Sequence, residues 1–177
     1  YEWAKDEPGG PLDTFAVMAG DGQMDPADLE AVVMPIVRGE ADYVKGTRFR
    51  DEATKHVMPK ARFIVGHVLS RLTGFAVGMT IEDSQCGYTA MSRALAERLP
   101  LGDIWSGFGY PNDLIARVAE CGGRIEHVPV RARYGDEVSR VGARHVPRIG
   151  LIVASALWRR VGPLRQPRGA SSRLNAS

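Results

Sequence analysis

Short apolar runs alternate with amphipathic stretches along the first 130 residues of the chain. Residues 15–18 and 41–46 form two such runs, and each ends at a polar segment that contains glycine, as buried strands of a parallel sheet do. Residues 125–130 form a third run. Asp25-Pro26 predicts the start of a helix between the first two runs, with Asp25 as its N-cap. This alternation predicts an α/β domain with a mainly parallel central sheet.

Further helices are expected from apolar residues at helical spacing and from capping residues. They lie at residues 60–72, 92–99 and 112–121. The polar stretches are expected to be loops, at residues 1–13, 47–59 and 83–88. Ligands of open α/β sheets bind at the carboxyl ends of the strands. Because Asp21, Arg48 and Asp83 each follow an apolar stretch, we expect all three to face one crevice.

Two of these polar segments carry candidate ion-binding residues, one segment for a cation and the other for an anion. Asp21 and Gln23 offer a carboxylate and an amide oxygen two residues apart, which are hard ligands suited to Mg²⁺ or Mn²⁺. A simple turn is the alternative interpretation. Arg48 and Arg50, with Arg62 on the next helix, favour a phosphate site, because arginine makes bidentate contacts to phosphate. A solvated basic loop is the alternative there.

Asp83 is the candidate catalytic carboxylate. It follows an apolar stretch and precedes a glycine turn at Gly87, a place from which it can deprotonate an acceptor hydroxyl. If the acceptor is already an anionic phosphate, little proton abstraction is needed, and Asp83 instead positions groups or balances charge. Glu82 is the rival carboxylate, and spacing alone does not choose between the two.

The charge of the chain is divided unevenly. Residues 131–177 hold ten arginines and only two acidic side chains, whereas residues 1–130 hold 13 basic and 19 acidic ones. The apolar segment 149–158 is flanked by arginines and contains Trp158, but it is too short to span a bilayer, which takes about 20 residues. Such a helix suits a membrane interface, and docking on the domain's own core is the alternative. A nucleic-acid partner is not expected, because no recognition motif accompanies the arginines.

The motifs in this order resemble the family 2 glycosyltransferases, especially the dolichol- and polyprenyl-phosphate mannose or glucose synthases. The matching stretches are residues 17–26, 42–49, 83–88, 107–108, 112–122, 127–130 and 134–139. The resemblance implies a nucleotide-diphospho-sugar transferase, or GT-A-like, fold. It also implies transfer of a sugar from a nucleotide-sugar donor, with inversion, to a polyprenyl-phosphate acceptor at the membrane surface.

The resemblance also implies roles for individual residues. Asp21 would be the second aspartate of the Asp-x-Asp metal motif, with Gln23 as a further ligand of Mg²⁺ or Mn²⁺. Arg48 and Arg62 would hold the acceptor phosphate, and Asp83 would lie on the acceptor side of the transfer centre. Less directly, the resemblance places three residues near the donor diphosphate: Arg133, Ser139 and Arg140.

Two departures from the family pattern accompany these expectations. Ala19 stands where the first metal-motif aspartate is expected, so one carboxylate is missing. Family members also begin with a nucleotide-binding strand and turn that precede the first residue of this sequence. We therefore expect this chain to bind nucleotide poorly by itself.

The sequence thus predicts three parts: a catalytic domain at residues 1–146, an interfacial helix at 147–162 and a disordered tail at 163–177. The two cysteines lack metal-ligand spacing and no signal peptide is visible, which favours a cytoplasmic protein bound peripherally to the inner face of the membrane. Two alternative functions stay open, namely sugar transfer to a glycan or small hydroxyl acceptor, and a non-catalytic nucleotide-sugar or lipid-binding module. The sequence leaves the oligomeric state open.

Overall fold

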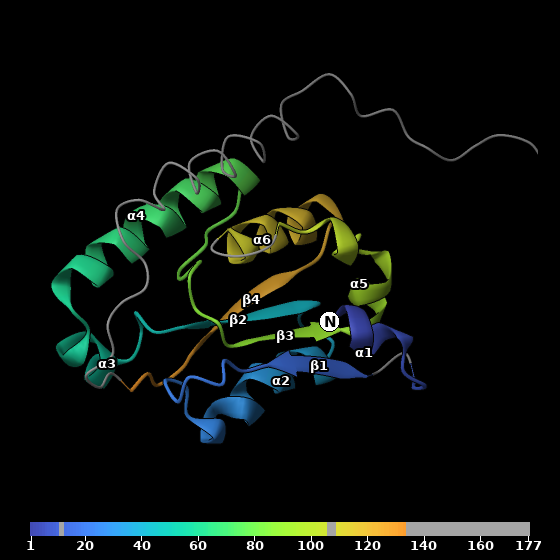
Figure 1. Ribbon diagram of the computed structural model, residues 1–177, viewed down its shortest axis with the longest axis horizontal. Helices are drawn as coiled ribbons and strands as arrows, with labels where there is room; N and C mark the ends of the chain where they lie inside the picture. The colour runs from blue at the N-terminus through green and yellow to red at the C-terminus, as the bar shows by residue number, and fades with distance from the viewer. Residues whose placement is uncertain (11–12, 106–108, 134–177) are drawn as a thin grey trace, which may run out of the picture.

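A computed structural model describes residues 1–10, 13–105 and 109–133 of the chain. At its centre lies a four-stranded sheet with the strand order β1-β3-β2-β4 (Figure 1). The strands are β1 (Thr14–Val17), β2 (Tyr43–Thr47), β3 (Thr89–Ser92) and β4 (Ile125–Pro129). β3 pairs antiparallel with both β1 and β2, whereas β4 runs parallel to β2.

The sheet is therefore mixed rather than mainly parallel, which corrects the expectation from the sequence. The difference lies in β3, whose four residues come directly before a helix. A segment this short carries no periodic signal that distinguishes a strand from the approach to the helix. Its central place shows in two ways: β1 and β2 pair with it on either side, and Thr89, Ala90 and Met91 are all buried.

The helices surround the sheet. They are α1 (Glu2–Asp6), η1 (Pro26–Asp28), α2 (Leu29–Val37), α3 (Glu52–Val57), α4 (Lys60–Val77), α5 (Arg93–Arg98), η2 (Leu101–Asp103) and α6 (Tyr110–Glu120). Two predicted N-caps are confirmed. The Asp25 carboxylate accepts a hydrogen bond from the Ala27 N–H, and the Ser92 hydroxyl accepts one from the Leu95 N–H.

Three boundaries differ from the expectation. Residues 1–13 include the short helix α1, and residues 47–59 include α3, which begins after the N-cap Asp51. α4 continues through Gly74 and ends at Gly78, whose φ of 74° is the left-handed conformation that glycine adopts readily. Gly74 serves packing instead, because a Cβ there would lie 2.7 Å from the Met79 carbonyl oxygen.

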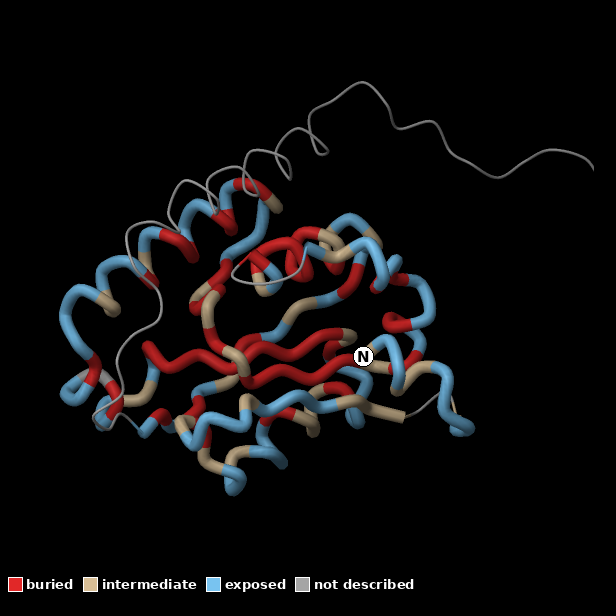
Figure 2. Tube along the Cα trace, in the orientation of Figure 1, coloured by how far each residue is buried: buried red, intermediate tan, exposed pale blue. Residues whose placement is uncertain are grey.

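Two hydrophobic clusters fill the two faces of the sheet. One joins Tyr43 and Met91 to α5 and α6 through Leu95 and Leu114, and the other joins Val44 to α2 through Val32. Neighbouring residues on a strand point to opposite faces, so Tyr43 and Val44 enter different clusters. Figure 2 shows the buried strands between these layers, with α4 lying farther out beside α6.

The topology brings the polar segments to one edge of the sheet. β1, β2 and β4 run in the same direction, and the antiparallel β3 begins where the other three end. The segments that follow β1, β2 and β4 therefore meet the loop that precedes β3. The predicted interfacial helix (147–162) and tail (163–177) lie outside the described residues. Within the described ranges, no helix has the length and apolar character needed to cross a bilayer.

Candidate functional site

The loop of residues 83–88 packs against the ends of two strands. Gly46, near the end of β2, leaves room for Cys86, since a Cβ at Gly46 would lie 3.1 Å from the Cys86 sulfur and 2.8 Å from Val130. A Cβ at Gly87 would lie 3.5 Å from the Ala19 Cβ, beyond the end of β1. These approaches place Ala19, β2 and the loop side by side.

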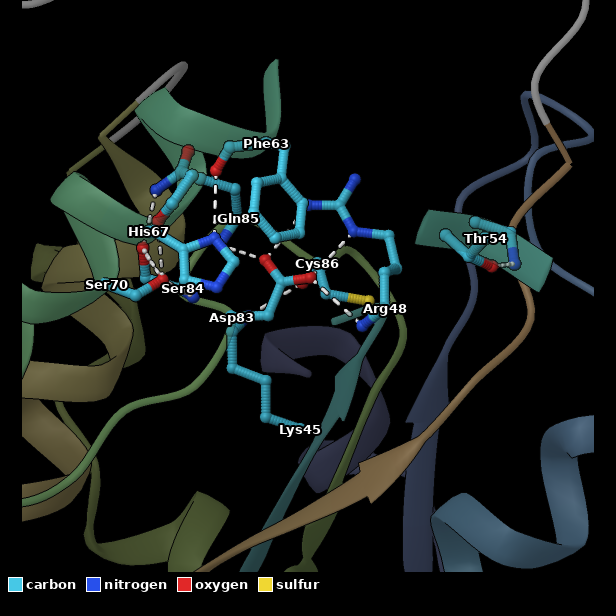
Figure 3. Close-up of polar contacts among 12 residues, drawn as sticks. Lys45, Arg48, Thr54, Phe63, His67, Ser70, Asp83, Ser84, Gln85 and Cys86 are labelled. Atoms are coloured by element: carbon cyan, nitrogen blue, oxygen red, sulfur yellow. Dashed lines mark hydrogen bonds and ion pairs between the residues drawn. The ribbon is translucent and has the colours of Figure 1, made fainter. Parts of the chain in front are cut away.

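A buried ion pair joins β2 to this loop. The Asp83 carboxylate accepts hydrogen bonds from Arg48 Nε at 2.7 Å, from Arg48 Nη2 at 2.9 Å and from the Arg48 backbone N–H at 3.2 Å (Figure 3). The Gln85 N–H adds a fourth at 3.2 Å. Asp83 is fully buried and Arg48 is 5% exposed. Two of the residues singled out from the sequence therefore contact each other directly.

This environment keeps Asp83 ionised. Burial alone would raise the pKa of Asp83, but the charges of Arg48 and Lys45 and the hydrogen bonds from Arg48 more than offset it, and the pKa lies below its ordinary value. A carboxylate that works as a general base at neutral pH is instead expected to have a pKa near the working pH. In this arrangement Asp83 is suited to hold a cation or a loop in place, and poorly suited to accept a proton.

Lys45 is a third charged residue at this place, and the sequence pattern indicates it only as part of a basic loop. It is 1% exposed, and its ammonium group donates a hydrogen bond of 2.6 Å to the Cys86 carbonyl oxygen. Burial lowers the pKa of Lys45, while Asp83 and Cys86 oppose that effect. The signal available in the sequence was the lysine within the apolar run 41–46, where a charged side chain needs a buried partner.

A hydrogen-bond network ties the same loop to α4 and α6. The Ser84 N–H donates to the Ser70 hydroxyl at 2.9 Å, and Gln85 Nε2 donates to Asn112 Oδ1 at 3.1 Å. Thr73 of α4 also donates to Asn112 Oδ1, at 3.0 Å. The loop is therefore held from the sheet side by Arg48 and Lys45, and from the helix side by polar residues that local sequence patterns do not indicate.

The rival carboxylate Glu82 has a different partner. Arg50 forms an ion pair with Glu82 and also donates a hydrogen bond of 3.5 Å to the His127 carbonyl oxygen. The Glu82 side chain is 23% exposed and that of Arg50 is 52% exposed. The structure thus separates the two carboxylates, because Asp83 is buried against Arg48 and Glu82 lies nearer the surface with Arg50.

The proposed metal ligands lie in an exposed turn beyond β1. Asp21 is exposed, and its Oδ1 accepts a hydrogen bond of 3.0 Å from the Gln23 N–H. The Gln23 carbonyl oxygen accepts one of 2.9 Å from the Arg133 N–H, so the turn is joined to the segment that follows β4. Across the described ranges, no three His, Cys, Asp or Glu side chains are grouped so that they could hold a metal ion.

The remaining predicted residues are distributed around this edge. Arg133 is brought close to the turn, and its Nη2 lies 3.5 Å from Asp25 Oδ2. Arg62 lies in the first turn of α4 and is half-buried. Ser139 and Arg140 lie outside the described residues. The structure thus brings Arg48 and Asp83 into contact and places Gln23 beside Arg133.

Comparison with known proteins finds no matching family model. The chain is 30% identical over 115 residues to an uncharacterized protein of Methanocaldococcus jannaschii, covering 64% of this chain and 47% of that protein. It is 30% identical over 82 residues to a UDP-N-acetylglucosamine–dolichyl-phosphate N-acetylglucosaminyltransferase of Methanococcus voltae, covering 46% and 33%. It is 27% identical over 114 residues to a polyprenol monophosphomannose synthase of Mycolicibacterium smegmatis, covering 64% and 43%.

These similarities support a broad relationship to the glycosyltransferases. The chain spans between a third and about half of the length of the relatives that it matches. The chain itself is an α/β domain with a mixed four-stranded sheet.

Proposed function

We propose that this chain is part of a glycosyltransferase that moves a sugar from a nucleotide-sugar donor to a polyprenyl-phosphate acceptor at a membrane surface, with inversion at the anomeric carbon. The observation that carries the proposal is the buried Arg48–Asp83 pair at the carboxyl edge of the sheet. It provides a fixed charge arrangement without a general base. A phosphate acceptor fits this chemistry, because its oxygen is already anionic and needs no base to activate it.

On the acceptor side, we assign the phosphate to Arg48 and Arg62. Two N–H groups of the Arg48 guanidinium engage Asp83. Asp83 fixes the plane of that guanidinium and is therefore a positioning residue in this proposal. Arg62 lies on the face of α4 that also carries Leu69 and Thr73, by spacings of seven and eleven residues, and this is the buried face of the helix.

On the donor side, we assign Asp21 and Gln23 to a divalent cation, and Arg133, Ser139 and Arg140 to the donor diphosphate. The exposed turn, with one carboxylate and one amide, fits a Mg²⁺ or Mn²⁺ ion that takes its other ligands from water and phosphate oxygens. When bound, such an ion neutralises charge on the leaving diphosphate. The Asp21 carboxylate orients this end of the site, and its own turn hydrogen bond to Gln23 holds it in place.

Two alternatives differ in what they ask of Asp83. Transfer to a glycan or small hydroxyl acceptor requires a true base, which the complete burial and lowered pKa of Asp83 disfavour. A non-catalytic binding module is favoured by Ala19, since one expected metal-ligating carboxylate is absent. The two alternatives therefore predict different results in the sugar-transfer assay described next.

The decisive experiment measures sugar transfer by the full-length protein. Radiolabelled nucleotide sugars are incubated with extracted membrane lipid, with and without EDTA, beside the variants Asp21→Ala and Asp6→Ala. We expect metal-dependent label in an acid-labile lipid, lost by at least about tenfold in Asp21→Ala, because each 1.4 kcal/mol of lost transition-state stabilisation slows the reaction tenfold. Asp6 is an exposed residue of α1, and its variant should retain the activity.

The other outcomes assign the function differently. Label found in water-soluble glycan and absent from lipid would support the hydroxyl-acceptor alternative. Label in neither fraction, with nucleotide sugar still bound, would support the binding module. Lipid label that survives both EDTA and Asp21→Ala would contradict the metal assignment while leaving the acceptor assignment in place.

A further inference from the structure

The outer face of α4 carries an exposed apolar stripe. Ile64, Val68 and Leu72 are spaced four residues apart and are 61%, 51% and 44% exposed, and Val65 beside them is 38% exposed. Residues at this spacing share one face of a helix. The opposite face is buried and holds Gly66, Leu69, Ser70, Thr73, Gly74 and Ala76. Figure 2 shows this division along α4, with buried positions toward the molecule and exposed ones away from it.

The charges on the helix select the kind of partner. None of the 18 residues of α4 is acidic, whereas Lys60 and Arg71, eleven residues apart, are both exposed along one side of the stripe. An apolar stripe lined along one side by cations and lacking carboxylates suits a helix that lies in the interface of an anionic membrane. We propose that this outer face of α4 docks on the surface of an anionic lipid bilayer.

Charge argues against the two other occupants that this chain itself can supply. A second copy of α4 would bring Lys60 and Arg71 together with further cations and no carboxylate from either helix, and like charges across an interface are costly. The apolar segment 149–158 of the same chain is bordered by Arg148, Arg159 and Arg160, so its charges repel those of α4 in the same way.

The docking places the candidate site next to the lipid surface. Ser70, on the buried face of α4, donates its hydroxyl hydrogen to the Gly66 carbonyl and accepts from the Ser84 N–H, so the helix separates the stripe from the loop that contains Asp83. A helix with its side chains is about 10–12 Å across. The inference deepens the proposed function and rests on it. The proposed function supplies the reason for docking, because it requires Arg48 and Arg62 to come within this distance of a membrane-bound phosphate.

The test measures vesicle binding by the full chain in the absence of any sugar donor. Vesicles of phosphatidylcholine mixed with phosphatidylglycerol are compared with vesicles of phosphatidylcholine alone, in a sedimentation assay. We expect Val68→Ser combined with Leu72→Ser to weaken binding to the mixed vesicles by roughly tenfold or more, because each apolar side chain inserted into lipid contributes of the order of one such factor. Lys60→Gln with Arg71→Gln should weaken binding to the mixed vesicles and leave binding to pure phosphatidylcholine unchanged.

A matched control comes from the other side of the sheet. Val37, at the end of α2, is 58% exposed, and Val37→Ser should bind the mixed vesicles within about twofold of the unchanged chain, since its side chain is not in the stripe. Unchanged vesicle binding by the stripe variants would overturn the inference. If they instead abolish self-association in sedimentation without vesicles, the occupant is a second copy. If they lower the melting temperature and leave vesicle binding intact, it is a segment of the same chain.

These outcomes are independent of the proposed activity. The vesicles contain neither polyprenyl phosphate nor nucleotide sugar, so binding can be retained when sugar transfer is absent. Vesicle binding through α4 with no label in lipid would refute the proposed function and keep this inference. Label in lipid, together with vesicle binding that is unchanged in the stripe variants, would refute this inference and keep the proposed function.

Discussion

Arg48 and Asp83 form the most deeply buried charge pair among the described residues. A second ion pair, which lies at the surface, has the same hydrogen-bond geometry. Asp42 accepts from Arg124 Nε, Nη2 and backbone N–H at 3.0, 3.2 and 2.9 Å, which repeats the three contacts of the buried pair. The Arg124 side chain, however, is 57% exposed. Solvent screens the outer pair and not the inner one, so equal geometry should have unequal energetic value.

Replacing one partner of each pair tests this difference. Asp83→Asn should lower the free energy of unfolding by about 3–5 kcal/mol, because it leaves Arg48 buried without a counter-charge. Asp42→Asn should cost at most about 1 kcal/mol. Urea unfolding of both variants measures the values. The activity of Asp83→Asn must therefore be expressed per folded molecule.

A double-mutant cycle checks the origin of the loss. Arg48→Met combined with Asp83→Leu removes both charges, so the double variant should be clearly more stable than the sum of the two single losses implies. Strict additivity would show that the two side chains do not depend on each other, and would contradict the role of Asp83 as the residue that positions Arg48.

At the scale of elements, α4 and the segment after β2 are joined through one glycine. Phe49 lies against Gly66, and its ring stacks on His67 with centroids 4.0 Å apart and meets Phe63 edge-on at 5.4 Å. This contact fixes α4 relative to Arg48, the neighbour of Phe49 in the chain. Glycine is required at position 66 because the Phe49 ring packs directly against it, and a Cβ there would lie only 2.7 Å from Phe49 Cζ.

Gly66→Ala should therefore destabilise the protein, against the usual trend. Alanine in a helix interior is favoured over glycine by up to about 1 kcal/mol, but here the added methyl group should cost about 1–3 kcal/mol through overpacking. Phe49→Leu in the same chain provides the control, because the smaller side chain makes room. The double variant should lose less than the two single variants together, as measured by thermal unfolding; an equal or larger loss would mean that Phe49 is not the obstacle.

At the scale of the whole molecule, folding disfavours the protonated form of His127. This residue of β4 is 8% exposed, and its Nε2 donates to the Thr80 carbonyl at 3.2 Å. Burial lowers the pKa of His127, and Arg50 and Lys45 lower it further against the opposing charges of Glu82 and Glu126. Below its ordinary pKa of about 6.5, the unfolded chain binds the proton more readily than the folded one.

The free energy of unfolding should consequently fall as the pH drops from about 7 through 6.5 and below. His127→Gln should flatten this dependence. Asp83 acts in a separate window, since its lowered pKa gives stability that is present above about pH 4 and is lost on further acidification. Urea titrations at a series of pH values measure both. A pH dependence of His127→Gln equal to that of the unchanged chain would contradict the assignment.

Local patterns in the sequence determined much of the framework. The Asp25 and Ser92 caps, the helix in residues 112–121 and the strand near residues 41–46 depend on neighbours in the chain, and they are found where the patterns place them. That Asp21, Arg48 and Asp83 face one crevice, which is expected because each follows an apolar run, stays a prediction. The sequence did not distinguish Asp83 from Glu82, because adjacent carboxylates have the same local spacing.

Only the tertiary structure decided which groups are buried together. Arg48 and Asp83 are 35 residues apart, and Lys45 meets Cys86 across 41 residues, so no local preference specifies their pairing. The antiparallel direction of β3 likewise depends on its place between β1 and β2. Short-range sterics and caps act within a few residues, whereas burial and charge pairing depend on packing that brings distant segments together. The sequence therefore determined the elements and the candidate residues, and packing determined their partners and their protonation.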